Sequence, residues 1–183
     1  IGANIQTEIP AGCDFIAVED TSQLRDEMLL RFKDFDLIIM NAAVSDYRVK
    51  DVSSEKIKKT KEEMTIDLVK NPDILQEISS HKFKGQIIVG FAAETFENDA
   101  DFENAAKLKL KQKGCDVIFA NKVKNGQAME STNNEFLMVT QNGTKKLNLK
   151  NKLNLANEAL DYLSALRVKV DSISKSPVEP DLA

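Results

Sequence analysis

Lysines, carboxylates and amides are the side chains of this sequence that have the chemistry to build a reaction site. The chain has one histidine, His81, and nothing near it in the sequence pairs with it. A Ser-His-Asp triad or a multi-histidine zinc site therefore has almost nothing to draw on. The two cysteines, Cys13 and Cys115, are too few for a disulfide framework, and we interpret both as small core residues. Chemistry in this chain must therefore rest on charge and positioning.

Two groups of lysines are the main cationic signal. Lys56, Lys58 and Lys59 lie close together, and Lys109 and Lys113 have i, i+4 spacing within a predicted helix. Like charges at that spacing repel each other, and an anionic ligand would relieve the repulsion. The alternative, which spacing alone favours, is that these lysines form solvated surface.

Three further positions keep two interpretations each. Asp46 could accept a hydrogen bond from a ligand amino group or could cap the turn that follows it. Phe91, at a predicted strand end, fits the core better than a stacking platform for a base. Asn71-Pro72-Asp73 predicts the start of a helix, and a helix N-terminus also attracts anions.

Composition limits the partners of the protein. The chain has 183 residues, 42% of them hydrophobic and 30% charged, which is the balance of one globular domain, two at most. A net charge of −4 disfavours wholesale binding to nucleic acid or anionic membranes, so an anion site must be built locally. No apolar run approaches the ~20 residues of a membrane-spanning helix. We expect a cytoplasmic protein with no nucleic-acid or membrane partner.

Short apolar runs alternate with helical segments along most of the chain. Strands are predicted at Asp14–Val18, Asp36–Met40, Gln86–Phe91 and Asp116–Ala120. Helices are predicted from Asp20, which has capping-box spacing to Gln23, to about Asp34, then from Asn71-Pro72, and over Asp99–Lys113 with Gly114 as its terminator. This alternation predicts an α/β fold with a mainly parallel sheet and helices on both faces.

The C-terminal part follows a different pattern. Phe136–Thr140 and Lys145–Leu149 flank an Asn-Gly pair, which predicts an antiparallel hairpin appended to the sheet. An amphipathic helix is predicted from about Asn151 to Leu166. We expect one domain over residues 1–168 and a polar, extended tail over residues 169–183.

A lysine-rich segment between Asp46 and Val69 interrupts the alternation. Its lysines before Met64 predict a loop or hairpin arm, and the alternating residues Met64–Leu68 predict a half-exposed strand. A connection between strand and helix in a compact domain is usually about 2–6 residues long, so an insertion of this length indicates a functional segment.

Ligands of open α/β sheets bind at the carboxyl ends of the strands. Here those ends are Asn41–Asp46, Gly90–Thr95 and Ala120-Asn121, and the first two are rich in small residues that let a ligand approach the backbone. None of the seven glycines has the spacing of a dinucleotide fingerprint or a P-loop.

Five motifs in a fixed order carry a specific resemblance. They are NAAVSDYR at residues 41–48, KIKK at 56–59, LVKNPDIL at 68–75, GFAAET at 90–95, and the trio Ala106, Lys109 and Lys113. From about Ala11 to about Leu166 the chain resembles the phosphopantothenoylcysteine synthetase family, the phosphopantothenate–cysteine ligases. This domain is often the C-terminal half of a bifunctional bacterial coenzyme A biosynthesis protein.

The resemblance implies a Rossmann-like ligase that consumes CTP and Mg²⁺. The carboxylate of 4′-phosphopantothenate would attack the α-phosphorus of CTP and expel pyrophosphate, and the amine of L-cysteine would then displace CMP from the acyl-cytidylate. The residues implied in nucleotide contacts are Met40, Asn41, Ala42, Asp46, Pro72, Asp73, Ile74, Leu75 and Phe91. Lys56, Lys109 and Lys113 would face phosphates, with Lys56 the catalytic residue.

The resemblance also implies a homodimer, in which the arm Lys56–Leu68 would reach toward the partner's site. FMN would belong only to a separate, fused decarboxylase domain that is not in this chain. Because the substrate acid is already ionised at neutral pH, the first step needs charge neutralisation and in-line positioning rather than a general base.

The sequence departs from the family pattern at several places. The family's Ala-Asn-Asp-Val is Ala120-Asn121-Lys122-Val123 here, and Met129 stands where a loop phenylalanine is usual. The N-terminal glycine-rich strand-turn-helix and the Ser-Asn-x-Ser-Ser-Gly segment are absent from this sequence. Since those parts hold some of the triphosphate in the family, we expect this chain alone to bind CTP poorly.

Two rival functions remain at the level of sequence. One is a Rossmann-like nucleotide-sugar or NAD enzyme without its N-terminal fingerprint, although Asp46 does not sit where such an enzyme places its ribose-binding acid. The other is a non-catalytic interaction domain that uses the lysine-rich arm as a docking surface.

Overall fold

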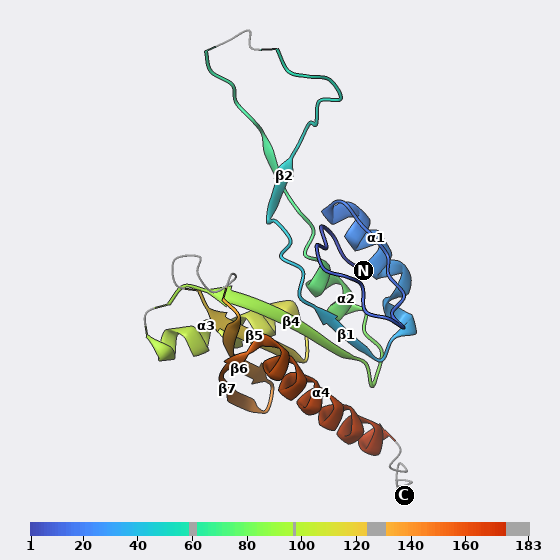
Figure 1. The fold of residues 1–183 in the computed structure, drawn as a ribbon, viewed down its shortest axis with the longest axis vertical. Coiled ribbons are helices and arrows are strands. Elements are labelled where there is room, and N and C mark those ends of the chain that lie inside the picture. The colour runs from blue at the N-terminus through green and yellow to red at the C-terminus, as the bar shows by residue number, and fades with distance from the viewer. Residues whose placement is uncertain (59–61, 97, 124–130, 175–183) are drawn as a thin grey trace, which may run out of the picture.

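The computed structural model describes residues 1–58, 62–96, 98–123 and 131–174, with side chains as far as residue 168. Its centre is a five-stranded sheet of order β1-β4-β5-β6-β7 (Figure 1). The strands are β1 (Leu37–Met40), β4 (Ile87–Glu94), β5 (Val117–Lys122), β6 (Asn133–Thr140) and β7 (Gly143–Asn151). The first three run parallel and the last two are antiparallel. The predicted α/β fold with an appended hairpin is therefore confirmed.

Helices cover both faces of this sheet. On one face, α2 (Ile74–Ser80) and α3 (Asp99–Lys113) bury Leu75 and Leu110 against the strands. On the other face, α4 (Lys152–Ser174) packs Leu163 into a separate core. The helix α1 (Thr21–Arg31), with its continuation η1 (Phe32–Asp34), lies beside α2 (Figure 1). Among the described residues, no helix has both the length and the hydropathy needed to cross a bilayer.

Most predicted helix ends are confirmed by their caps. The Asp20 side chain accepts a hydrogen bond of 2.9 Å from the backbone N–H of Gln23, three residues into α1. At the end of α3, Gly114 adopts φ 64°, a left-handed conformation that glycine takes without the steric cost of a Cβ. These local signals are readable from sequence because each involves residues only three or four positions apart.

The predicted start of α2 is wrong by two residues. The N-cap is Asp73, whose Oδ1 accepts a hydrogen bond of 3.1 Å from the Gln76 N–H. Asn71 and Pro72 precede the helix, and Asn71 is buried rather than capping. The spacing from Asp73 to Gln76 is the stronger capping signal, although the Asn-Pro pair just before it also favours a helix start.

The predicted strand Asp14–Val18 is also wrong. The segment has a single parallel bridge, between Gly2 and Ala17, with hydrogen bonds of 3.0 and 3.1 Å on either side of it. Asn4 then adopts φ 53° and turns the chain away, so the N-terminal segment cannot continue the ladder. An apolar run becomes a strand only where a neighbouring strand pairs with it.

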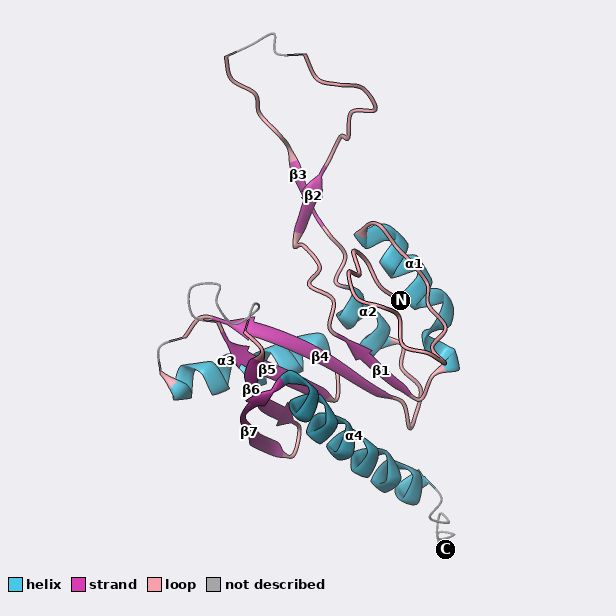
Figure 2. Cartoon of the chain, viewed as in Figure 1, coloured by secondary structure: helices cyan, strands magenta, loops and turns pink. Residues whose placement is uncertain are grey.

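The lysine-rich segment forms a long arm that projects from the body (Figure 2). At its base β2 (Tyr47–Val49) pairs antiparallel with β3 (Leu68–Lys70) as a separate two-stranded sheet. The arm prediction is thus confirmed, but the strand lies at Leu68–Lys70 and not at Met64–Leu68. Alternation marks an extended segment, whereas the strand forms only where Tyr47–Val49 lies opposite. Lys59 and Lys61 lie outside the described residues.

The C-terminal hairpin turns at Gln141-Asn142, with Thr140 paired to Gly143. The following helix is longer than predicted: α4 continues to Ser174, so residues 169–174 of the expected extended tail are helical, and residues 175–183 lie outside the described part. Cys115 is buried as expected, and burial raises the pKa of its thiol to about 11. Cys13, by contrast, is exposed, so its interpretation as a core residue is wrong.

Close packing of α2 on β4 depends on a glycine. A Cβ added to Gly90 would overlap the Leu75 side chain and lie 2.9 Å from Cδ1 of Ile118. Since protein interiors are packed to crystal density, the ends of both side chains would have to shift to admit a methyl group. Gly90 therefore lets α2 lie against the middle of the sheet.

We predict that Gly90→Ala destabilises the fold by about 1–3 kcal/mol, the usual cost of overpacking. The methyl group would push α2 away from β4, and chemical denaturation measures the loss. Ala93→Ser, an exposed position on the same strand, is the control and should change stability little. A Gly90→Ala protein as stable as the parent would contradict the packing argument.

Candidate functional site

A pocket of about 250 Å³ lies at the carboxyl edge of the sheet, where the loop after β1, the start of α2 and one side of α3 meet. Its walls come from segments far apart in sequence. The lining residues are Met40, Ala42, Ala43, Val44, Ser45, Asp46, Lys70, Asn71, Pro72, Asp73, Ile74, Leu75, Phe91, Lys109 and Lys113.

The pocket brings together ten of the twelve residues that the sequence singled out. Ala42 and Asp46 come from one motif, which Met40 directly precedes. Pro72 to Leu75 come from a second motif, and Phe91, Lys109 and Lys113 from two more. Asn41 is exposed and is not in the lining. Lys56 is exposed on the projecting arm, outside the pocket of its own chain.

Asn71 ties the two sides of the pocket together. Its Nδ2 donates to the Ser45 carbonyl at 2.8 Å, and its backbone N–H donates to the Asp46 carbonyl at 2.8 Å. Its Oδ1 accepts from Arg48 at 3.1 Å. With 7% of its surface exposed, Asn71 is a buried clamp at the base of the arm. Sequence reasoning missed this role because no local spacing connects residue 71 to residues 45–48.

The two α3 lysines reach the pocket from one helix face. Lys109 pairs with Glu94 at 2.6 Å, and Lys113 pairs with Asp73 at 2.5 Å. The i, i+4 spacing predicts two neighbouring cations, but it does not indicate these carboxylate partners, which come from the end of β4 and the start of α2. A third lysine, Lys70, also lines the pocket and was missed, although it directly precedes the Asn71-Pro72 pair.

Asp46 and Phe91 give the pocket a charged side chain and an aromatic side chain. The Asp46 carboxylate is exposed, and within the described residues it forms no ion pair, so it is available to a ligand. Phe91 is half-buried and packs against Phe119 and Phe136, with ring centroids 5.5 and 5.7 Å away. Phe91 therefore belongs both to the core under α4 and to the pocket wall.

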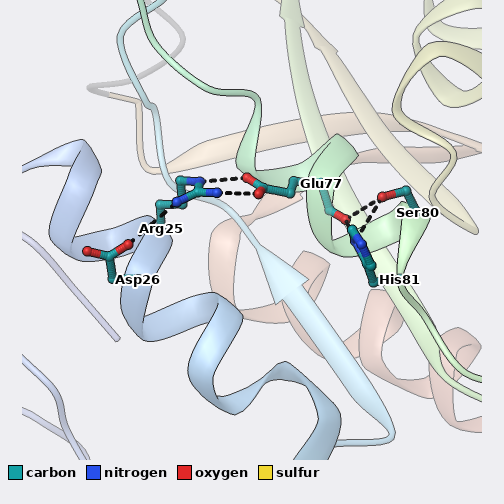
Figure 3. A network of polar contacts seen from close by, with 5 residues as sticks. All are labelled: Arg25, Asp26, Glu77, Ser80 and His81. Carbon is teal, nitrogen blue, oxygen red and sulfur yellow. Dashed lines mark hydrogen bonds and ion pairs between the residues drawn. The ribbon is translucent and has the colours of Figure 1, made fainter.

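An ion pair between Arg25 of α1 and Glu77 of α2 joins the two helices (Figure 3). Arg25 of α1 donates to both carboxylate oxygens of Glu77, through Nε at 2.7 Å and through Nη2. Those hydrogen bonds hold the pKa of Glu77 below its ordinary value and raise that of Arg25. His81 caps the far end of α2, where its Nδ1 lies 2.9 Å from the Glu77 carbonyl. His81 thus lies outside the pocket lining.

A larger cavity of about 750 Å³ lies near the start of α3, over β5, β6 and β7. Its lysines have carboxylate partners: Lys122 pairs with Asp99, and Lys146 pairs with Glu135 at 3.1 Å. None of the residues predicted for the site lines it. Met129, which stands where the family usually has a loop phenylalanine, lies outside the described residues.

The pocket at the sheet edge has the chemistry of an anion-binding site. Three lysines line it, Asp46 offers a free carboxylate, and small residues expose backbone from Ala42 to Ser45. Within the part of the chain that the structure describes, no group of three or more His, Cys, Asp or Glu side chains could hold a metal ion. Ligand recognition here must use lysines, backbone groups and single carboxylates.

Fold and pocket together define a Rossmann-like α/β domain with a cationic cleft at the carboxyl edge of its sheet. The chain belongs to the family described as the DNA/pantothenate metabolism flavoprotein C-terminal domain, which matches residues 1–166.

Individual relatives agree with this family. The chain is 44% identical over 122 residues to the coenzyme A biosynthesis bifunctional protein CoaBC of Haemophilus influenzae, covering 67% of this chain and 30% of that protein. The crystal structure of the C-terminal domain of a CoaBC superposes with a TM-score of 0.70 at 26% identity, covering 90% of this chain and 73% of that one. A Cab2 variant in complex with phosphopantothenate-cysteine shares the fold, with a TM-score of 0.70 at 17% identity over 88% of this chain and 55% of that one.

We predict that Arg25→Met lowers the melting temperature by a few degrees at neutral pH, because it removes the anchor between α1 and α2. The pKa of Glu77 is depressed in the folded state, so the pair stabilises the fold above the ordinary glutamate pKa and stops doing so as pH falls through the lower value. The difference between variant and parent should therefore shrink below about pH 4.

The control for that experiment is Arg31→Met, which removes an ion pair with Glu27 within α1 itself. Its effect should be smaller, since exposed i, i+4 pairs contribute little. A pH-independent difference for Arg25→Met would contradict the role given to Glu77.

Proposed function

We propose that this chain is the ligase domain of a phosphopantothenate–cysteine ligase, which joins 4′-phosphopantothenate to L-cysteine at the expense of CTP in coenzyme A biosynthesis. The observation that carries the proposal is the single pocket that gathers residues from four sequence motifs, including Asp46, Asp73 and Lys113. The bifunctional CoaBC relatives support it, with the chain spanning 30% of the Haemophilus influenzae protein. We assign any flavin chemistry of such a protein to its other part, and we place the enzyme in the cytoplasm.

The pocket residues suit activation of a carboxylate by a nucleotide. Lys109 and Lys113 would neutralise charge on the triphosphate, which is the main requirement of phosphoryl-type transfer. Asp46 would accept from the cytosine amino group, and the backbone of Met40–Ala42 would border the base. Lys70, which lines the pocket and forms no ion pair among the described residues, would add a further positive charge. No histidine is needed, because the acid substrate is already ionised.

The donor set fits a metal that arrives with the nucleotide. Mg²⁺ usually keeps several waters and binds through one or two carboxylates together with substrate phosphates. Asp73 and Glu94 are the carboxylates closest to the phosphate-binding lysines, and the described residues hold no three-ligand cage. When bound, Mg²⁺ would supply additional neutralisation of the triphosphate.

We propose that the active unit is a homodimer in which Lys56 serves the partner's pocket. The arm exposes large apolar side chains, among them Val52 at 83%, Met64 at 63% and Leu68 at 58%. Large apolar side chains that are exposed together on one segment are unfavourable in water and indicate a protein-binding surface. Because Lys56 does not line the pocket of its own chain, a catalytic role for Lys56 requires a second subunit.

We predict that mixing two inactive variants restores activity if Lys56 acts across the dimer. Lys56→Ala spoils the arm, and Lys113→Met spoils the pocket. A mixed dimer then has one intact pair of arm and pocket, so refolding equal amounts together should give about a quarter of the parental pyrophosphate release. The same mixture made from Lys56→Ala alone is the control. Complete inactivity of the mixed sample would place Lys56 in its own chain's site or remove it from catalysis.

We also predict that Asp46→Asn weakens selectivity for CTP over other nucleoside triphosphates by about tenfold, the value of one hydrogen bond to a charged group. Competition between CTP and UTP in the ligase reaction measures it. Asp26→Asn, on the surface of α1, should leave the preference unchanged. Unaltered selectivity in Asp46→Asn would remove Asp46 from base recognition.

A further inference from the structure

The two α3 lysines in the wall of the pocket are already paired with carboxylates of the protein. Lys109 and Lys113 each hold a carboxylate, Glu94 and Asp73 respectively, at 2.6 and 2.5 Å. The two carboxylates come from different elements, the end of β4 and the turn before α2. Both pairs are partly exposed: the accessible fraction of the side chain is 33% for Lys109 and 22% for Glu94, and 27% for Lys113 and 31% for Asp73. Water and ligands can therefore reach them.

Asp73 is held at its carboxylate, whereas Glu94 is held through its backbone. Asp73 is fixed through Oδ1, which accepts from the Gln76 N–H, while Oδ2 meets Lys113. Glu94 ends β4, and its carbonyl accepts from the Val123 N–H at 2.9 Å, which ties that strand end to the residue after β5. The carboxylates therefore remain near the lysines when a ligand arrives.

A polyphosphate that binds these lysines must share them with their carboxylates or displace the carboxylates, because each ammonium group has three N–H donors. In either case Asp73 and Glu94 would lie beside phosphate oxygens of the same charge, which is repulsive at close range. A divalent cation carried by the nucleotide changes the sign of that contact, because the freed carboxylates then face positive charge. The repulsion therefore weakens binding of the metal-free nucleotide more than binding of the nucleotide that carries a cation.

We infer that Asp73 and Glu94 are specificity-determining residues that make the pocket select a nucleoside triphosphate accompanied by a divalent cation over the metal-free nucleotide. This inference rests on the proposed function, since it takes CTP as the ligand. It assigns to Glu94 a role in the site although Glu94 is not part of the pocket lining.

Two isosteric variants test the inference without removing the local structure. Glu94→Gln removes one charge, and Asp73→Asn removes the other while asparagine can still cap α2. Glu135→Gln is the matched control, because it removes the same charge from an ion pair with Lys146 on the β6–β7 hairpin. Isothermal titration with CTP is carried out on each protein, once with excess Mg²⁺ and once with EDTA.

We expect metal-free CTP to bind each pocket variant about fivefold more tightly than it binds the parent, as the removal of one nearby like charge implies. Binding of CTP with Mg²⁺ should change less, so the ratio of the two dissociation constants shrinks in Glu94→Gln and Asp73→Asn. The ratio in Glu135→Gln should equal that of the parent.

An unchanged ratio in both pocket variants, with normal CTP binding by the parent, would overturn the inference and leave the proposed function standing. A lower melting temperature without a change in the ratio would do the same, since it would show a purely structural role. A parent protein that binds CTP under neither condition, at nucleotide concentrations high enough to detect the weak binding expected of this chain, would overturn the proposed function, and the inference would fall with it.

Discussion

The close approach of α2 to β4 at Gly90 is the constraint on which the pocket depends. Leu75 fills the space that a side chain at residue 90 would occupy, so the first turn of α2 lies directly over the middle of the strand. That position brings Asp73 within 2.5 Å of Lys113 on the neighbouring helix. The Arg25–Glu77 pair holds the same helix from its outer side. One short helix is thus fixed on both sides, and the pocket wall follows from its position.

The charge distribution of the site would allow an acidic protein to bind the polyanionic nucleotide of the proposed reaction. The net charge of −4 gives no general attraction for anions, so binding depends on lysines gathered at one edge of the sheet. Two of those lysines are balanced by carboxylates, which limits the repulsion that Lys109 and Lys113 would otherwise exert on each other. A bound polyanion would then compete with these carboxylates for the two lysines.

The proposed reaction needs a nucleotide pocket and a catalytic lysine, and in this chain the two lie on different segments. The pocket supplies nucleotide recognition from the body of one chain, whereas Lys56 lies on a projecting segment whose exposed apolar side chains favour contact with another molecule. Asn71 joins the two parts, because its side chain binds Ser45 and Arg48 at the base of the arm. The direction of the arm is therefore linked to the residues that border the pocket.

The sequence by itself determined the strands β1, β4 and β5, the caps of α1 and α3, and the hairpin. These features follow from apolar periodicity and from capping contacts over three or four residues, and the rule that parallel strands present their carboxyl ends at one edge placed the site there. Most of the residues that meet in the pocket were indicated by the resemblance of the ordered motifs to a known family. Only the tertiary structure decided the clamp at Asn71, the carboxylate partners of Lys109 and Lys113, the failure of Asp14–Val18 to form a strand, and the distance of Lys56 from its own pocket. Each of these depends on which distant segments become neighbours, and local spacing carries no information about that.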